Sequence, residues 1–294
     1  MPSQMTVNHW LAHAAAHLAQ YQAWQPVSGE AVNARREARA VLLAALEQAP
    51  AWLMTWPDAP LNAEQQARAD DFLARRAQGE PMAYLRGEQE FWSLALRVVP
   101  GVLVPRADSE CLVEQALLHL AANTTARVLD LGTGSGAIAL AIAHERREAR
   151  VFACDRSALA VTIAQGNAAR LGLALSCCES DWLSAFAGER FEMIVSNPPY
   201  IAEDDPHLAS LHGEPLTALT ATEQGLADLR QIITSAPAHL SAHGYLLLEH
   251  GYDQAAAVRD LLQQAGFVDV ASRRDFGGNE RVSLGRWPGA SHGD

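Results

Sequence analysis

The sequence predicts an α/β fold in which a small helical domain precedes a doubly wound, parallel sheet with a terminal antiparallel hairpin. Residues before Pro81 place apolar side chains at helical spacing, whereas short apolar strands alternate with helices from Ser109 onward. Repeated β-α units of this length imply a parallel, doubly wound sheet. We therefore expect a helical domain at residues 1–86, a β-hairpin linker at 87–107 and an α/β domain at 108–294.

The helical domain is predicted from three segments with apolar residues at helical spacing. These fall around Trp10–Gln22, Ala31–Glu47 and Asn62–Gln78. Asn62 is predicted as the N-cap of the third helix. Pro50, Pro57 and Pro60 are expected to break the run between the second and third helices. The domain is expected to end near Gly79–Pro81.

The linker and the α/β domain are predicted from a change to strand periodicity. Alternating apolar residues in Glu90–Pro105, around Pro100-Gly101, predict a β-hairpin that links the two domains. Further strands are expected at Arg127–Leu131, Val151–Cys154, Phe191–Ser196 and Tyr245–Glu249, and helices at Ala137–Glu145, Ala158–Leu171 and Gln254–Ala265. The final antiparallel hairpin is expected from Val268–Ser272 and Val282–Arg286.

Composition and charge narrow the possible functions. A net charge of −12 argues against non-specific nucleic-acid binding, which depends on a basic surface, so no direct nucleic-acid partner is expected. All 22 basic residues are Arg. The absence of Lys excludes a P-loop lysine, a Schiff base with pyridoxal phosphate and a kinase-type lysine. His13 and His17 have helical spacing but no third ligand, so no metal site is expected.

The sequence also predicts a cytoplasmic protein without a membrane association. No apolar run is long enough to span a bilayer. The N-terminus lacks the basic-then-apolar order of a signal peptide, because no Lys or Arg precedes Arg35. The four Cys residues lack Cys-x-x-Cys spacing and are expected to be reduced.

A glycine-rich loop is predicted between the first strand and the first helix of the α/β domain. Its glycines, in the segment Gly132-Thr-Gly134-Ser-Gly136, allow a tight turn and close approach to a ligand at a helix N-terminus. Asp155 ends the next strand, where a carboxylate can accept hydrogen bonds from ribose hydroxyls. The G-x-G-x-G spacing and the preceding Asp130 resemble the first motif of class I methyltransferases.

The segment Asn197-Pro198-Pro199-Tyr200 follows an apolar strand and is expected at the same sheet edge as the glycine loop. Two prolines fix the backbone, so the Pro198 carbonyl and the Asn197 side chain can accept both hydrogens of a planar –NH2 group. Such a grip orients a poorly nucleophilic amide nitrogen. Tyr200 offers a ring to pack on the target group, and the indole of Trp182, after Asp181, could stack on a purine.

Several further segments together resemble one family. These are Glu90-Phe-Trp-Ser-Leu94, Leu103-Val-Pro105-Arg106-x-Asp108-x-Glu110, Glu214-Pro215-Leu216-Thr-Ala-Leu219, Leu248-Glu249-His-Gly251 and Asp275-x-x-x-Asn279-Glu280-Arg281. With the Asn197–Tyr200 motif they resemble, over essentially the whole chain, the HemK (PrmC) family of peptide chain release factor glutamine methyltransferases. One departure is Leu211-His212-Gly213 before Glu214, where the family usually carries an Arg-Phe or similar pair and a longer loop.

The resemblance implies a Rossmann-like methyltransferase fold and a function. The enzyme would transfer a methyl group from S-adenosylmethionine to the glutamine amide nitrogen in the Gly-Gly-Gln motif of class-1 release factors, modulating translation termination. Cofactor binding would fall to Gly132, Thr133, Gly134, Ser135, Gly136, Asp155, Trp182 and Asn197. Asn197, Pro198, Pro199 and Tyr200 would bind the glutamine, with Asn197, Pro198 and Tyr200 catalytic. The helical domain would dock the release factor.

Three other functions compete with this interpretation. A methyltransferase acting on a glutamine of a ribosomal protein would share the cofactor site and the Asn197–Tyr200 motif, but not the Glu90–Leu94 block or the Asn279–Arg281 ending. An adenine-specific DNA methyltransferase is disfavoured by the acidic charge and by the lack of a recognisable DNA-reading domain. A non-catalytic cofactor-binding scaffold would have no reason to retain the amide clamp.

Overall fold

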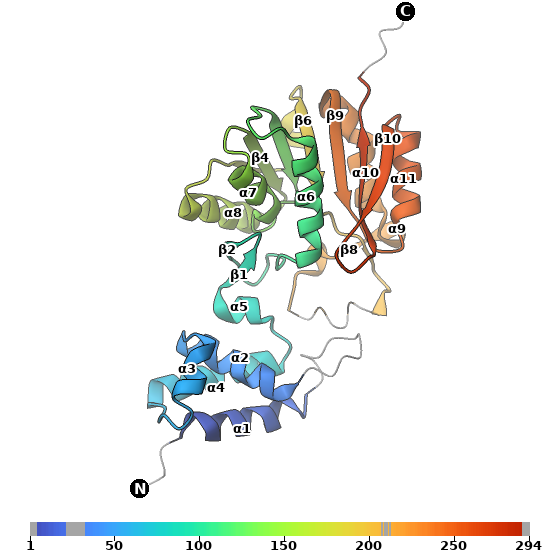
Figure 1. The fold of residues 1–294 in the computed structure, drawn as a ribbon. Helices are drawn as coiled ribbons and strands as arrows, with labels where there is room; N and C mark the ends of the chain where they lie inside the picture. The colour runs from blue at the N-terminus through green and yellow to red at the C-terminus, as the bar shows by residue number, and fades with distance from the viewer. Residues whose placement is uncertain (1–4, 22–32, 207, 209–210, 212, 290–294) are drawn as a thin grey trace, which may run out of the picture. The chain divides into compact units, whose positions relative to one another are not determined.

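The computed structural model describes residues 5–21, 33–206, 208, 211 and 213–289, and the chain divides into two compact units (Figure 1). The first unit contains residues 1–88 and 206–214, and the second contains residues 89–205 and 215–294. Among the residues so described, no helix combines the length and the apolar character needed to cross a membrane.

The first unit is a bundle of helices. They are α1 (Val7–Leu18), α2 (Ala34–Leu46), α3 (Pro50–Thr55), α4 (Ala63–Ala77) and α5 (Met82–Arg86). The three predicted helices are therefore found, although Gln22 and residues 31–32 lie outside the described residues. Asn62 caps α4 as predicted, because its side chain accepts from the Gln65 N–H at 2.8 Å while Gln65 Oε1 accepts from the Asn62 N–H at 3.0 Å.

Pro50 lies in the break between the second and third predicted helices, as expected, since α2 ends at Leu46 and α4 begins at Ala63. It also occupies the first turn of the short helix α3, which was not predicted. Proline is suited to that position because its missing N–H has no intrahelical partner there and its fixed φ is helical. The helices enclose a core of their own, which includes the fully buried side chains of Trp10, Leu18 and Leu42.

The second unit begins with a β-hairpin whose position differs from the prediction. Strands β1 (Glu88–Phe91) and β2 (Leu94–Arg97) form a two-stranded sheet. The chain turns at Trp92 and Ser93, where φ is 52° and 58°, and not at Pro100-Gly101. A two-residue turn in which both residues have positive φ matches the twist of paired strands. Such turns usually contain Asn-Gly, so the residues Trp92-Ser93 did not indicate a turn in the sequence.

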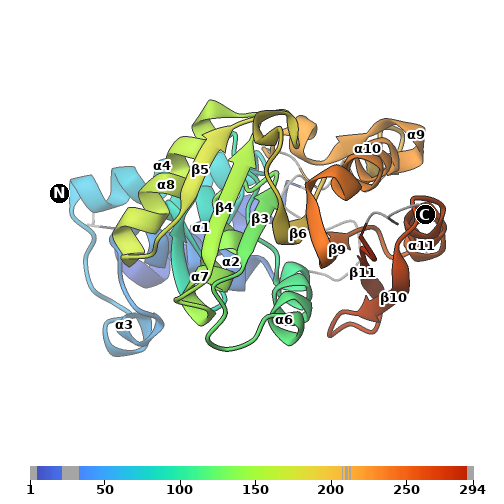
Figure 2. The same ribbon diagram turned by 90° about the horizontal axis from the view of Figure 1, so that it is seen from above.

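Seven strands form the main sheet of the second unit. They are β3 (Arg127–Leu131), β4 (Arg150–Asp155), β5 (Ser176–Glu179), β6 (Phe191–Ser196), β9 (Leu240–Glu249), β10 (Val268–Arg274) and β11 (Glu280–Arg286). Their order is β10-β11-β9-β6-β3-β4-β5 (Figure 2). The strand β11 runs antiparallel to both of its neighbours, β10 and β9, whereas all other neighbouring strands are parallel. The predicted parallel sheet with a terminal antiparallel hairpin is thus confirmed.

Helices cover both faces of this sheet. On one face lie α6 (Glu110–His119), α7 (Ala137–Glu145) and α8 (Ala158–Leu171), and on the other α10 (Ala227–Ser235) and α11 (Ala255–Gln264). Figure 2 shows α6 and α10 on opposite sides of the strands. Side chains alternate between two cores, since Val128 belongs to one and Leu129 to the other, as the two-residue period of a strand requires.

Short elements connect the longer ones. They are the 3-10 helices η1 (Ala107–Ser109), η2 (Ser184–Phe186), η4 (Leu216–Ala218) and η5 (Ala236–His239), the strands β7 (Ile201–Ala202) and β8 (Thr220–Ala221), and the turn α9 (Thr222–Gly225). Because β3, β4, β6 and β9 are parallel, their carboxyl ends lie at one edge of the sheet. That edge carries the candidate site.

Candidate active site

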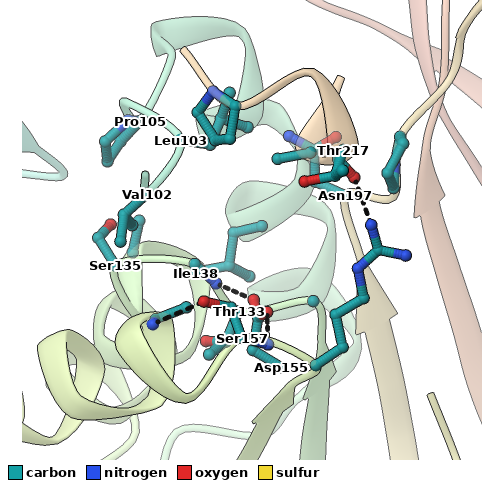
Figure 3. Close-up of a pocket in the computed structure, with 18 of the residues that line it drawn as sticks. Val102, Leu103, Pro105, Thr133, Ser135, Ile138, Asp155, Ser157, Asn197 and Thr217 are labelled. Carbon is teal, nitrogen blue, oxygen red and sulfur yellow. Dashed lines mark hydrogen bonds between the residues drawn. The ribbon is translucent and has the colours of Figure 1, made fainter. Parts of the chain in front are cut away.

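An open pocket with about 1120 Å³ of empty volume lies at the carboxyl edge of the sheet. Eight residues predicted for cofactor binding or for the amide clamp line it, namely Gly132, Thr133, Gly134, Ser135, Asp155, Trp182, Asn197 and Pro199. Figure 3 shows Thr133, Asp155 and Ser157 at one end of the pocket, and Asn197 and Thr217 at the other. Of the described residues predicted for the site, Gly136, Pro198 and Tyr200 do not line the pocket.

The glycine loop follows β3 and turns sharply into α7. Gly132, Gly134 and Gly136 all have positive φ, which favours glycine. A Cβ at Gly132 would lie 3.3 Å from the Trp182 ring. A Cβ at Gly136 would lie 3.2 Å from the Ala164 Cβ, so Gly136 allows close helix packing and does not face the pocket.

Asp155 holds the glycine loop and the start of the next helix together. Its Oδ2 accepts a hydrogen bond from the Gly134 N–H at 2.9 Å, and its Oδ1 accepts from the Ser157 N–H at 2.9 Å. A carboxylate has about four acceptor sites, so two remain for hydroxyl groups of a ligand. Asp155 therefore shapes the loop and still has acceptor sites for hydroxyl groups of a ligand.

Asp130 is a buried acid that holds the glycine loop through hydrogen bonds. It is 1% exposed, and its Oδ2 accepts from the Thr133 hydroxyl at 2.7 Å and from the Ala139 N–H at 3.2 Å. Burial raises the pKa of Asp130 to about 7, and these two hydrogen bonds oppose that rise. Its side chain thus fixes the loop conformation without lining the pocket.

Further polar side chains line the pocket together with Trp182. Asp181 lines the pocket, as does Asp228 of α10. Burial raises the pKa of Asp228. Arg156 also lines the pocket, and its guanidinium donates to the Thr217 carbonyl at 3.3 Å. Sequence reasoning missed Asp228 and Arg156, because neither stands in a motif with its own chemical signature.

The Asn197 side chain has a defined orientation. Its Nδ2 donates to the Ser109 hydroxyl oxygen at 3.1 Å, so its amide oxygen faces the other way. Ser109 is 4% exposed and also lines the pocket. The neighbouring Ser196 hydroxyl donates to the Leu131 carbonyl at 2.7 Å, which ties the end of β6 to the end of β3. Sequence reasoning did not assign a role to Ser109.

Tyr200 does not line the pocket and is held by hydrogen bonds to other elements. Its hydroxyl donates to Glu249 Oε1 at 3.1 Å, and its carbonyl accepts from the Gln254 side chain at 3.0 Å. Burial raises the pKa of the Tyr200 hydroxyl and, to about 7, that of Glu249. Glu249 ends β9 at the same edge as Asp155, a position that could have marked it as a site residue.

Family models match both parts of the chain. The PrmC N-terminal domain matches residues 9–87, and the methyltransferase small domain matches residues 109–213. A release factor glutamine methyltransferase from Salmonella typhimurium is 46% identical over 286 residues, covering 96% of this chain and 99% of the relative. Another with that name, from Pseudomonas aeruginosa, is 52% identical over 258 residues, covering 87% and 93%.

Solved structures share the fold. A methyltransferase from Pyrococcus furiosus superimposes with a TM-score of 0.53 at 18% identity, over 75% of this chain and all of that one. A 16S rRNA methyltransferase of T. thermophilus, solved with AdoMet and guanosine, gives a TM-score of 0.52 at 20% identity, over 68% and 49%.

Proposed function

This chain belongs to the release factor glutamine methyltransferase family, and from that we propose which groups of its pocket carry the reaction. The enzyme transfers a methyl group to a glutamine side chain of a release factor. The proposed donor is S-adenosylmethionine, and the proposed acceptor is the glutamine of the Gly-Gly-Gln loop of class-1 release factors. The observation that carries the proposal is that the glycine loop, Asp155 and Asn197 line one pocket.

The pocket residues fit S-adenosylmethionine. Gly132 and Gly134 leave room for a ligand against the backbone, and Asp155 keeps acceptor sites for ribose hydroxyls. The Trp182 ring offers a surface for a purine, and Asp181 offers an acceptor for its amino group. The carboxylates of Asp155, Asp181 and Asp228 also line the pocket, and their negative charge suits the positively charged sulfur of this cofactor. When bound, this cofactor supplies a methyl group on a positively charged sulfur.

The Asn197–Tyr200 motif is proposed to hold the glutamine amide. An amide nitrogen is a poor nucleophile because its lone pair is delocalised into the carbonyl. The Asn197 side-chain oxygen and the Pro198 carbonyl would accept its two N–H bonds and so orient the nitrogen. Those contacts strengthen as positive charge develops on the nitrogen. The nitrogen becomes acidic as it is methylated, so no dedicated general base is required.

The helical unit is proposed to dock the release factor. It has a hydrophobic core separate from those of the sheet unit, so it can present a surface of its own. The three proposed segments remain a docking domain at 1–86, a linker at 87–107 and a methyltransferase domain at 108–294.

Transfer of a labelled methyl group tests the function. We expect the protein to label a class-1 release factor, but not the same factor with its Gly-Gly-Gln glutamine replaced by glutamate. A ribosomal protein and DNA serve as competing acceptors. Labelling of either in preference to the release factor would contradict the proposed substrate.

A further inference from the structure

One buried amide joins two backbone segments that line the pocket. Asn167 of α8 is 1% exposed and does not line the pocket itself. Its Nδ2 donates to the Ser135 carbonyl at 2.9 Å and to the Arg97 carbonyl at 3.0 Å, and its Oδ1 accepts the Arg97 N–H at 2.8 Å. These partners fix the orientation of the amide, because a carbonyl can only accept and a backbone N–H can only donate.

The first segment is the glycine loop. Ser135 lies in this loop between Gly134 and Gly136, is 2% exposed and lines the pocket. Both neighbouring glycines have positive φ, a region that glycine enters as readily as any other, so the loop backbone has more conformational freedom than a chain with side chains. The hydrogen bond from Asn167 therefore fixes a carbonyl in a stretch of backbone that its glycines would otherwise leave free.

The second segment follows β2, which ends at Arg97. Residues 101–106 of this segment line the pocket, and Val102 is one of them (Figure 3). Val102 packs against apolar side chains of α8, the helix that carries Asn167. A Cβ at Gly134 would lie 4.0 Å from Val102 Cγ1, so the segment reaches the glycine loop. The two segments are thus adjacent parts of the pocket wall, and Asn167 holds both by their backbones.

We propose that Asn167 is a positioning residue for the cofactor, which joins these two segments and so fixes the shape of the pocket that receives S-adenosylmethionine. This inference rests on the proposed function, since the spacing of the segments matters only for the ligand that binds between them. A pocket already shaped for its ligand loses less conformational entropy on binding than one that has to be ordered first. Without Asn167, three backbone groups of Arg97 and Ser135 would lose this partner, and the segments would move to find others.

Cofactor binding to two variants tests this role. Asn167→Asp keeps the shape of the side chain but has no N–H for the two carbonyls, and Asn167→Ala removes every contact without burying a charge. We expect the affinity for S-adenosylmethionine, measured by calorimetry, to fall by about 10- to 100-fold in each, the equivalent of one or two buried hydrogen bonds. The matched control is Val151→Ala, which weakens the core near the amino end of β4, at the opposite edge of the sheet. Its affinity should stay within about threefold of the wild type.

The kinetic constants separate the positioning of the cofactor from the chemical step. The hydrogen bonds that hold the Asn197–Tyr200 motif come from Ser109 and Gln254 and do not involve Asn167. We therefore expect KM for the cofactor to rise with its dissociation constant, while turnover at saturating cofactor stays within about threefold. A loss of stability alone would lower the amount of active enzyme and leave KM unchanged. An unchanged KM in both variants, or a loss confined to turnover, would overturn the proposal.

Hydrogen exchange tests the junction without the cofactor. In Asn167→Ala, the backbone amides of residues 97–106 and 132–137 should exchange about tenfold faster than in the wild type, because both segments lose a fixed contact. Val151→Ala should not show this local pattern. An acceleration spread evenly over the sheet unit, or none in these two segments, would overturn the proposal. A wild-type protein that binds no S-adenosylmethionine would instead count against the proposed function, because hydrogen exchange still reports whether Asn167 joins the segments.

Discussion

Gly225 lies directly against the backbone of Tyr200. A Cβ at Gly225 would stand 2.0 Å from the Tyr200 carbonyl oxygen and 2.7 Å from Nε2 of Gln254, which donates to that same oxygen at 3.0 Å. Gly225 also has a φ of 82°, which favours glycine. The close approach of the Gly225 and Tyr200 backbones, together with the Gln254 hydrogen bond, thus fixes the position of the end of the Asn197–Tyr200 motif.

We expect Gly225→Ala to displace this motif. The added methyl group has to move the Tyr200 carbonyl, and a misplacement of about 1 Å can cost on the order of 100-fold in turnover. Stability should fall by roughly 1–3 kcal/mol, because the clash adds to backbone strain. Kinetic assays and denaturant unfolding measure the two effects. The control is Gly166→Ala in α8, where a Cβ meets nothing within 4 Å. Equal behaviour of the two variants would contradict the role of Gly225.

Asp155→Ala should weaken S-adenosylmethionine binding. The carboxylate is expected to accept ribose hydroxyls and holds the Gly134 and Ser157 N–H groups. Loss of such an acceptor typically costs about 1–3 kcal/mol, which calorimetry can measure. The exposed Asp260 of α11 provides the control substitution, Asp260→Ala. If both variants bind the cofactor as the wild type does, Asp155 is not part of the site.

A chain of residues 87–294 should separate cofactor binding from substrate docking. The two cores around the sheet contain no residue before Phe91, and the core of the helical unit lies within residues 5–85. The shortened chain should therefore fold and bind S-adenosylmethionine like the full chain. It should methylate an intact release factor poorly, but a free Gly-Gly-Gln peptide as well as the full chain does. Full activity on the intact release factor would exclude the docking role.

Two buried acids predict how stability depends on pH. Burial raises the pKa of Glu249 from 4.5 to about 7 and that of Asp130 from 3.8 to about 7. The charged and titratable groups that face them are Asp108, Cys111, Tyr200 and Arg281 around Glu249, and Cys154, Asp155 and Cys177 around Asp130. Each acid binds its proton more tightly in the folded protein than in the unfolded chain.

A raised folded-state pKa fixes the sign of this dependence. The stabilisation is present below the unfolded pKa and is lost as the pH rises through about 7. We expect the free energy of unfolding, from urea titrations, to carry a component that falls over this interval. Glu249→Gln and Asp130→Asn should each remove part of that component. If neither variant changes the slope, the acids do not titrate as their burial implies.

The sequence predicted six of the seven strands of the main sheet, because buried parallel strands are apolar and stand out from the helices between them. It did not predict β5, α6 or α10. Arg127–Leu131, Ala137–Glu145 and Phe191–Ser196 have the predicted bounds. The hairpin turn at Trp92-Ser93 could not be predicted, since tertiary packing imposes a positive φ on residues that rarely adopt it.

The candidate site was predicted where a motif carries its own chemistry. The glycine loop, Asp155 and Asn197 are such cases, and they line one pocket. Ser109 and Glu249 are single residues from η1 and β9, and only the fold brings them behind Asn197 and Tyr200. The spacing of residues along the chain does not predict contacts between residues so far apart in the sequence.

Asn197→Ala isolates the amide clamp. Asn197 follows the last residue of β6 and is only partly buried, so its removal should leave the fold intact. It takes away one acceptor for the N–H pair of the glutamine, a contact that strengthens as the nitrogen becomes positive. Loss of an oriented electrostatic contact of that kind typically costs on the order of 100- to 1000-fold in turnover.

Comparison of three measurements separates this role from a structural one. Cofactor affinity of Asn197→Ala should fall much less than turnover, because Asn197 is one contact among many in the pocket. Tyr200→Ala should act mainly on substrate binding, if its ring packs on the target group. Thermal unfolding should show Asn197→Ala close to the wild type, because no core side chain is lost. Turnover of Asn197→Ala within about threefold of the wild type, far short of the expected loss, would rule out the clamp.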